Sequence, residues 1–443
     1  MLHVAPHSWR QPAVKPKENG SKTIPRLLHL FHLLGPGLIT GAADDDPSGI
    51  ATYSQIGAQF GLTMLWTLVF AYPLMAAIQE ASTWIARVSG IGLAGNIRLH
   101  YPVWLSYAAV SILLFANVVN LAADIAAMAD ALGLVAGGPV LLYTLMFGGI
   151  CLSGVVFVSY RIFTRVLKWG ALVLFVYVAT AFVVHMPLRG IIAGSFLPTI
   201  RLSGGYMTAL TAVLGTTISP YLFFWQASQE VEEQKAAPGE QPLRWTPRQA
   251  TMQLKPMRAD TYLGMAVSNV IAYFIVLDTG TLLHAHGITQ IDAATQAAEA
   301  LRPIGGEFAF LLFGIGIIGT GLLAVPVLAG SVGYALAELG SWPHGLSKTL
   351  QSTRAFYGSI AAVTLLGLIL NLSHVSPIKA LFWSAVINGV SAGPIMIVVI
   401  LMTTNRKITG SLQFPRPQWI LGWTSTTAMV AVAVCMLTDF AFG

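Results

Sequence analysis

The sequence has very few charged residues. Asp, Glu, Lys and Arg make up 9% of its 443 residues, whereas a soluble domain carries roughly a quarter. Hydrophobic residues make up 55%, and this balance excludes a soluble globular domain of ordinary composition. We therefore expect an all-helical polytopic membrane protein whose main surroundings are the lipid bilayer.

Cysteine is scarce as well. Cys151 and Cys435 are the two cysteines, and both lie in apolar runs far apart in the sequence. This argues against a disulfide framework or a cysteine-based metal site. The first 28 residues are polar and lack an apolar core, so we expect residues 1–28 to form a cytosolic tail and not a cleavable signal peptide.

Long apolar runs dominate the rest of the chain. A helix that crosses the bilayer needs about 20 apolar residues. The candidate spans lie at about 31–59, 61–86, 103–131, 138–159, 167–187, 205–231, 258–283, 307–337, 355–371, 377–403 and 418–440. Residues 29–403 would form a ten-helix core with two repeats, about 31–187 and 205–403, and a cytosolic loop at about 230–257. Residues 404–443 would add an eleventh helix.

The net charge of +6 could suggest a nucleic-acid partner, but the basic residues follow a membrane pattern. If the N-terminus is cytosolic, most of the 24 Lys and Arg residues fall in cytosolic segments. The exceptions are Arg189, Arg201, Arg302 and Lys379. Basic loops face the cytosol and anionic lipid, so we expect no nucleic acid, a cytosolic N-terminus and an outer C-terminus. The setting would be a bacterial inner membrane.

Two of the spans look broken. Residues 41–55 in the first read GAADDDPSGIATYSQ, and residues 213–233 in the sixth read VLGTTISPYLFFWQASQEVEE. Proline removes a backbone donor, and in lipid such a break survives only if it is buried in protein or lines a wet cavity. The breaks lie five spans apart, so two five-span units would have opposite orientations. This pattern is typical of inverted-repeat transporters, whose site lies where two broken helices meet.

The three consecutive aspartates at the first break indicate a cation. A carboxylate in the bilayer is costly unless it faces a cavity or a partner, and neither broken helix carries a Lys or Arg near its break. Carboxylate, carbonyl and hydroxyl oxygens suit a small hard cation. We expect Asp46 to bind it, Asp45 to line the approach, and Asp44 to bind polar groups elsewhere. The simpler alternative is that these aspartates only cap the second half-helix.

Both broken helices resemble those of the NRAMP divalent-metal transporters, and the similarity covers the chain from about residue 30. The family's hallmarks are Asp-Pro-Gly-Asn in the first helix and Met-Pro-His in the sixth; here the corresponding stretches are DPSG and SPY. The resemblance implies a LeuT-like fold of ten core helices in two inverted repeats, with helices 1 and 6 broken. It also implies a transporter and not an enzyme, with the metal as substrate, no cofactor and no obligate protein partner.

The resemblance places the family's metal ligands on Asp46, Gly49, Thr216 and Ser219, and its motif histidine on Tyr221. Gly49 stands where the family has asparagine, and Ser219 where it has methionine. A thioether favours transition metals, whereas a hydroxyl is a hard ligand. Mg²⁺ usually keeps several of its waters. The pattern is therefore similar to the NRAMP-related magnesium transporters, and implies transport of partly hydrated Mg²⁺ together with Mn²⁺.

The third span bears on proton coupling. Asp124 matches one of the family's proton-carrying acids, but the other two fall on Asn117 and Ala127. The resemblance thus implies weak or no proton coupling, with the membrane potential as driving force, about 2.3 kcal/mol per charge per 100 mV. The alternative for Asp124 is a structural carboxylate that is bonded to another helix.

Other intramembrane polar residues are candidates for lining the site. They are Ser48, Asn117, Asn120, Gln226 and Asn388. The amides could reach the hydration shell of the ion, or could simply bond neighbouring helices. We expect Glu230, Glu232 and Glu233 to form a solvated cytosolic face.

Three other functions stay open at this point. The first is a proton-coupled Mn²⁺/Fe²⁺ symporter of the ordinary NRAMP kind. The second is an organic-cation symporter of the same fold, since the DDD stretch argues only against an anion. The third is a Mg²⁺-dependent intramembrane enzyme, but that chemistry needs a second acidic cluster, and the second break has no acid before Glu230.

Overall fold

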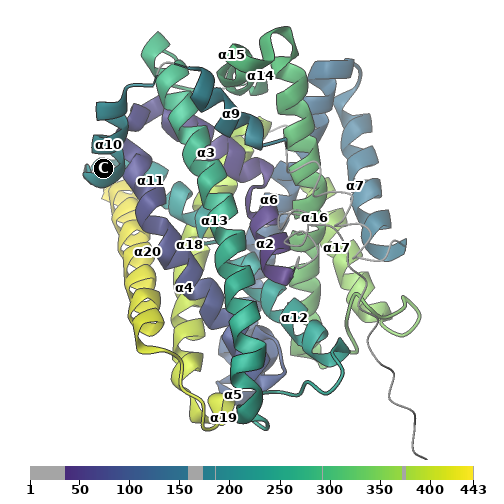
Figure 1. Ribbon diagram of the computed structural model, residues 1–443. Helices are drawn as coiled ribbons and strands as arrows, with labels where there is room; N and C mark the ends of the chain where they lie inside the picture. Colours follow the sequence, from purple (N-terminus) through teal and green to yellow (C-terminus); the bar gives the residue numbers. More distant parts are fainter. Residues whose placement is uncertain (1–34, 158–172, 185, 292, 372–375, 443) are drawn as a thin grey trace, which may run out of the picture. The chain divides into compact units, whose positions relative to one another are not determined.

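The computed structural model describes residues 35–157, 173–184, 186–291, 293–371 and 376–442. The ordered elements within these ranges are helices (Figure 1). The expected N-terminal tail, the start of the first span and the first part of the fifth span lie outside the described residues.

Both expected breaks are present, and they have the same construction. The first span consists of α2 (Pro36–Asp44) and α3 (Pro47–Phe60), and the sixth consists of α11 (Gly204–Thr217) and α12 (Pro220–Ala236). Two non-helical residues separate each pair, and the second of them, Asp46 or Ser219, is extended. A proline then opens the second half-helix, because proline disfavours helix at the residue before it but fits the first helical position.

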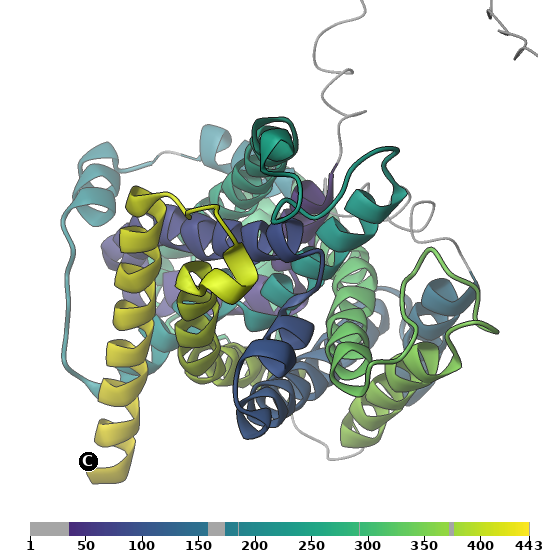
Figure 2. The ribbon, with the colours of Figure 1, turned by 90° about the horizontal axis from the view of Figure 1, so that it is seen from below.

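Each of the other spans is a single helix in the part of the chain that the structure describes. The first repeat continues with α4 (Leu65–Ser89), α6 (Val103–Ala136), α7 (Val140–Phe157) and α9 (Phe175–Val183). The second continues with α13 (Ala250–Leu282), α16 (Ala309–Gly340), α17 (Arg354–Leu370) and α18 (Pro377–Thr404), and α20 (Arg416–Phe442) follows. In the view from below, α20 lies at the edge of the bundle, where it packs on α18, α4 and α11 (Figure 2).

Short helices connect the spans at the two ends of the bundle. One end carries α5 (Leu93–His100) and α19 (Arg406–Thr409), and the other carries α14 (Ala294–Ala298) and α15 (Arg302–Gly305) (Figure 1). A further short helix, α10 (Leu188–Phe196), follows α9. The connection that we expected at about 230–257 is helical at both ends, since α12 continues to Ala236 and α13 begins at Ala250.

Glycines let the first half-helix of each repeat approach its neighbour closely. A Cβ on Gly41 of α2 would lie 2.2 Å from the carbonyl oxygen of Gly264 on α13. A Cβ on Gly215 of α11 would lie 2.3 Å from the backbone nitrogen of Gly389 on α18. Small residues allow this backbone-to-backbone contact in membrane proteins. The two contacts hold the first half-helix of each repeat directly against its neighbouring helix.

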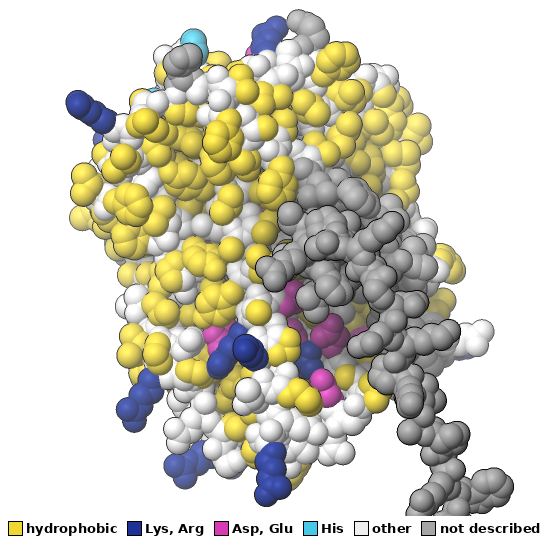
Figure 3. Space-filling model, viewed as in Figure 1, with side chains coloured by type: hydrophobic (Ala, Val, Ile, Leu, Met, Phe, Trp, Pro, Cys, Tyr) yellow, Lys and Arg dark blue, Asp and Glu magenta, His cyan; other side chains and the backbone are white. Residues whose placement is uncertain are grey.

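The prediction of a solvated face at Glu230, Glu232 and Glu233 is wrong for Glu230 and right for Glu233, whose side chain is 50% exposed; Glu232 is partly exposed. The Glu230 side chain is 1% exposed and pairs with Arg87 of α4 at 2.6 Å. Glu233 also pairs with Arg87, at 2.8 Å, and Glu232 accepts hydrogen bonds from Tyr334 and from the backbone of Leu346. A buried arginine needs such partners. Acidic and basic side chains gather toward the lower end of the face in Figure 3, below a mainly hydrophobic surface.

Candidate functional site

Asp46 is buried at the start of α3 and accepts hydrogen bonds from three elements. Its Oδ1 accepts from the backbone N–H of Gly49 at 2.6 Å, which makes Asp46 the N-cap of α3. Its Oδ2 accepts from Asn120 Nδ2 on α6 at 2.9 Å, and Tyr221 of α12 reaches it at 3.5 Å. The cap that we considered as an alternative is therefore real. The Asp46 carboxylate can still accept further interactions, because an ionised carboxylate has about four lone-pair sites.

Asn120 is oriented by a second set of residues. The Ser384 hydroxyl of α18 donates to Asn120 Oδ1 at 2.8 Å, and Ser48 lies 2.8 Å from Ser384. Ser48 also reaches the carbonyl oxygen of Leu381 at 2.8 Å. This arrangement points the Asn120 amide nitrogen toward Asp46. It places α3, α6 and α18 around one carboxylate.

Asp44 and Asp45 share a different partner. Ser268 of α13 lies 2.6 Å from Asp44 Oδ2 and 3.1 Å from Asp45 Oδ1. Both aspartates are buried. Their carboxylates thus lie on the α13 side of the break, whereas Asp46 lies on the α6 side. The sequence reasoning did not identify Ser268.

Thr216 at the second break and Gly49 at the first break face the same region. A Cβ on Gly49 would lie 3.1 Å from Thr216 Oγ1, 3.3 Å from the Asp44 carbonyl oxygen and 3.4 Å from Asp46 Oδ1. Gly49 therefore stands at a point where oxygen atoms of both breaks converge. Thr216 and Gly49, two of the predicted ligand positions, are brought together with Asp46.

Ser219 contributes differently. Its hydroxyl donates back to the Gly215 carbonyl at 2.7 Å and lies 3.1 Å from the Thr216 carbonyl. These carbonyls are among the last in α11, where no helical partner remains for them. The hydroxyl thus binds the Thr216 carbonyl that the sequence predicted as a ligand. A carbonyl oxygen has two lone pairs, so one of them stays available.

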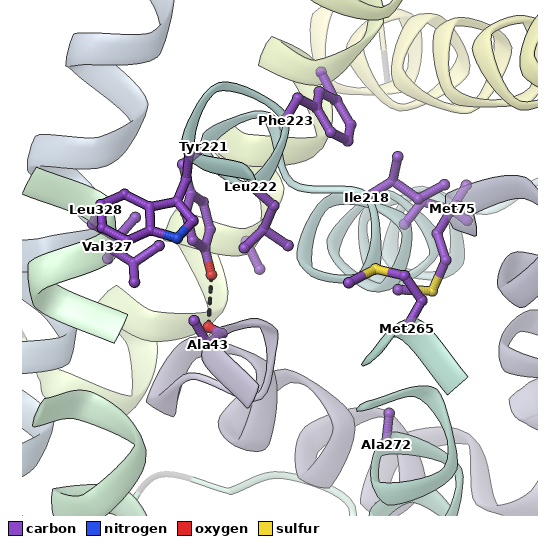
Figure 4. Packing of buried hydrophobic residues seen from close by; sticks show 14 of the residues in the cluster. Ala43, Met75, Ile218, Tyr221, Leu222, Phe223, Met265, Ala272, Val327 and Leu328 are labelled. Atoms are coloured by element: carbon purple, nitrogen blue, oxygen red, sulfur yellow. Dashed lines mark hydrogen bonds between the residues drawn. The ribbon is translucent and has the colours of Figure 1, made fainter. Parts of the chain in front are cut away.

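Tyr221 joins the two broken helices. Its hydroxyl donates to the Ala43 carbonyl in the last turn of α2 at 2.9 Å (Figure 4). The ring belongs to the buried hydrophobic cluster, and its helix α12 packs on α16. A histidine in this place would titrate near neutral pH. A tyrosine hydroxyl stays neutral there and serves as a donor.

The third helix carries one acid near the site. Asp124 is fully buried on α6, interacts electrostatically with Asp46 and interacts weakly with the backbone amide of Ser48. Neither carboxylate oxygen makes a hydrogen bond of good geometry to a described residue. Asn117 is neutral and donates to Ser331 and to the Leu328 carbonyl of α16, at 2.7 and 3.0 Å.

The remaining amides differ in their contacts. Gln226 donates to Thr261 at 2.8 Å and accepts from Gln79 at 2.7 Å, so it bonds α12 to α13 and α4. Asn388 is buried, and its Oδ1 has no partner among the described residues. Gln226 therefore forms interhelical hydrogen bonds, whereas the side-chain oxygen of Asn388 has no hydrogen bond to any described residue.

Sequence reasoning missed Ser268 and Ser384. A serine in an apolar helix usually forms a hydrogen bond to the backbone of its own helix. The residue type alone therefore does not indicate that a serine belongs to the site. Ser384 precedes Asn388 by one turn in the same stretch, and this spacing places both on one face of α18. That relation was the available clue.

Neutral oxygen and amide groups are the direct neighbours of Asp46, and the other acids of the region point elsewhere or lack hydrogen bonds of good geometry to described residues. Within the described ranges, no three His, Cys, Asp or Glu side chains converge on one point. Asp46 is joined instead by carbonyl, amide and hydroxyl groups. Such a set suits a hard cation that keeps part of its water shell.

Two discontinuous helices that meet at a buried carboxylate define a membrane transporter with the inverted-repeat, LeuT-like fold. The fold is shared with the manganese transporter of Eremococcus coleocola, at a TM-score of 0.72 and 13% identity, over 95% of this chain and 89% of that chain. It is shared with Mhp1, a nucleobase-cation-symport-1 family transporter, at a TM-score of 0.56 and 13% identity, over 91% and 92%.

The chain belongs to the Nramp family. The family model described as natural resistance-associated macrophage protein-like matches residues 37–439. The divalent metal cation transporter MntH of Klebsiella pneumoniae subsp. pneumoniae is 27% identical over 440 residues, which is 95% of each chain. MntH of Klebsiella pneumoniae strain 342 is 26% identical over 434 residues, covering 94% of this chain and 95% of the relative.

Proposed function

We propose that this protein carries divalent metal cations across a membrane, and that Mg²⁺ and Mn²⁺ are both substrates. The cation would bind Asp46 between the two broken helices while it keeps part of its water shell. The names of its MntH relatives support divalent metal transport. The preference for hydrated ions rests on the residues of this chain.

The observation that carries the proposal is the environment of Gly49. Three oxygen atoms, from Thr216, Asp44 and Asp46, surround the position of its missing Cβ. Because Gly49 has no side chain, it offers the metal no amide ligand that would displace one of its waters. Mg²⁺ gives up its waters reluctantly, so a site without this ligand favours Mg²⁺ more than a site with a direct amide ligand does.

Ser219 supports the same conclusion. Position 219 at the second break carries a serine and not a methionine, and the Ser219 hydroxyl contacts two carbonyl oxygens of α11. A site without sulfur loses the ligand that distinguishes transition metals from Mg²⁺. We infer relaxed selectivity among hard divalent ions.

Weak or absent proton coupling is part of the proposal. Asn117 is neutral and fully engaged on its donor side by α16, and Ala127 carries no acid. The membrane potential alone supplies about 4.6 kcal/mol per divalent ion per 100 mV. Uptake without a proton gradient is therefore energetically sufficient.

One observation favours a second candidate, a proton-coupled Mn²⁺/Fe²⁺ symporter. Asp124 is a buried acid that interacts with Asp46 and lacks a hydrogen bond of good geometry. A carboxyl group in this situation could take up a proton when the cation leaves. We rank this candidate second because, of the three third-helix positions at which the resemblance places acids, only Asp124 carries one here.

The proposed setting is a bacterial inner membrane with the N-terminus in the cytosol and the C-terminus outside. Lys and Arg residues lie mainly at the end of the bundle that carries α5 and α19, as the rule for cytosolic loops requires. The C-terminal end of α20 lies toward the opposite end (Figure 1). We propose no cofactor, enzymatic activity or obligate protein partner.

The test is uptake into proteoliposomes by the wild type and Asp46→Ala. We expect Asp46→Ala to abolish Mg²⁺ and Mn²⁺ uptake, whereas Asp130→Asn, which changes a half-buried acid elsewhere on α6, should transport normally. Normal uptake by Asp46→Ala would show that the site lies elsewhere.

A further inference from the structure

Asp278 is a further buried acid that lies away from Asp46. It lies on α13 and is fully buried. Neither of its carboxylate oxygens has a hydrogen-bond partner among the described residues. A carboxylate in this situation inside a membrane is costly and marks a functional group more often than a structural one.

The neighbour of Asp278 is also without a partner. Tyr177 of α9 is buried and interacts electrostatically with Asp278, and its hydroxyl makes no hydrogen bond within the described residues. Helices α9 and α13 pack directly on each other. Two oxygen-bearing side chains that lack hydrogen-bond partners among the described residues thus lie on two packed helices, within electrostatic reach of each other.

The position of Asp278 along the membrane follows from the contacts of α13 with α2 and α3. Ser268 contacts Asp44 and Asp45 at the break, whereas Thr279 lies against Gly57, and His284 bonds the Ala58 carbonyl. Asp278 is therefore near the height of Gly57, eleven residues beyond Asp46. That distance is about 16 Å along a helix, toward the end that carries α14 and α15.

A tight apolar contact lies between these two heights. It is formed by Ile50, one turn beyond Asp46, with Leu174, Tyr177, Leu301, Phe313 and Ile317. The side chains leave no room for a water molecule. We call these six residues the outer seal. Tyr177 belongs to the outer seal and also adjoins Asp278, so opening the seal would wet Asp278.

We propose that Asp278, together with the Tyr177 hydroxyl, forms a transient binding site for the divalent cation at the outer edge of the seal, which is accessible only when the seal opens and is occupied before Asp46. This inference rests on the proposed function. With the seal closed, Asp278 has no hydrogen-bond partner among the described residues, and its burial is unfavourable. Opening the seal supplies water and a cation, and hard cations prefer carboxylate and hydroxyl oxygens. Because the burial of Asp278 is unfavourable when the seal is closed, it also favours the conformation in which the outer seal is open.

The experiment measures initial rates of Mn²⁺ uptake against outside Mn²⁺ concentration, in proteoliposomes with an imposed potential. The variants are Asp278→Asn, Tyr177→Phe, the double variant and the control Asp130→Asn. We expect Asp278→Asn to raise KM at least fivefold with an unchanged maximal rate. Tyr177→Phe should raise KM less, and the double variant no more than Asp278→Asn. Thermal unfolding in detergent verifies that each variant folds.

Two results would overturn the inference. A wild-type KM for Asp278→Asn would show that the carboxylate meets no cation. A lowered maximal rate with unchanged KM would show a structural role. Asp46→Ala is measured alongside: if it is inactive while Asp278→Asn behaves as wild type, the inference fails and the proposed function stands. If the wild type takes up no divalent cation, the proposed function fails and the inference fails with it.

Discussion

Replacing Gly49 by asparagine would place an amide oxygen among the oxygen atoms of both breaks. Gly49 lies in the first turn of α3, so a side chain is compatible with its helical backbone. The added Cβ would meet Thr216 Oγ1, Asp44 O and Asp46 Oδ1 at 3.1, 3.3 and 3.4 Å. These contacts are tight but require shifts of only a few tenths of an ångström, and all three neighbours are oxygen atoms. We expect the amide oxygen to act as a direct ligand of a cation that is bound to Asp46.

The size of the effect follows from the hydration of the ion. An amide oxygen at this position replaces about one water of a partly hydrated cation, and Mg²⁺ resists that loss more than Mn²⁺ does. We expect Gly49→Asn to raise the ratio of Mn²⁺ to Mg²⁺ uptake efficiency about tenfold. This corresponds to about 1.4 kcal/mol of differential binding.

Gly49→Ala is the matched control, because it fills the same space without a ligand. It should slow both ions by similar factors and leave their ratio near that of the wild type. The assay is competition between Mg²⁺ and Mn²⁺ for uptake into proteoliposomes. An unchanged ratio in Gly49→Asn, or an equal change in Gly49→Ala, would refute the reasoning from the missing amide ligand at Gly49.

Three further predictions concern the contacts around the site. Asn120→Ala removes a buried hydrogen bond to the Asp46 carboxylate, which is worth about 1.5–3 kcal/mol. We expect the variant to fold normally and its uptake efficiency to fall at least tenfold; uptake at the wild-type rate would contradict this. Tyr221→Phe removes the hydrogen bond between α12 and the Ala43 carbonyl and should lower the free energy of unfolding by about 1 kcal/mol. The melting temperature in detergent should therefore drop slightly; an unchanged melting temperature would show that this hydrogen bond does not stabilise the fold. Arg87→Ala leaves Glu230 buried without its positively charged partner, which costs about 3–5 kcal/mol, so the yield of folded protein in size-exclusion profiles should fall. Adding Glu230→Gln should restore the yield. A double variant with the same low yield would show that the loss does not come from the unpaired Glu230.

The broken helices were predictable because their signals are local. Proline at 47 and 220 disfavours helix at the preceding residue whatever surrounds it. Asp46 and Ser219 are good N-cap residues in their own right. The position of each break, and the pairing of one break with the other by five spans, follow from the sequence without a partner being known.

The partners of the polar residues were not predictable in this way. Arg87 and Glu230 are 143 positions apart, and Asn120 and Asp46 are 74 apart. Helix composition indicates which residues are buried but not which helices meet. Glu230 therefore looked solvated in the sequence, and Asn120 could not be distinguished from Asn117 as the amide that contacts Asp46.

The most direct test of the central claim is uptake of Mg²⁺ and Mn²⁺ into proteoliposomes under an imposed potential, with a pH dye inside. The claim is that a site with Asp46 as ligand and no amide at Gly49 carries a partly hydrated divalent ion without a proton. It predicts that Mg²⁺ enters and that the interior does not acidify. Entry of Mn²⁺ with acidification and without Mg²⁺ would contradict it, and would assign the protein to the proton-coupled symporters.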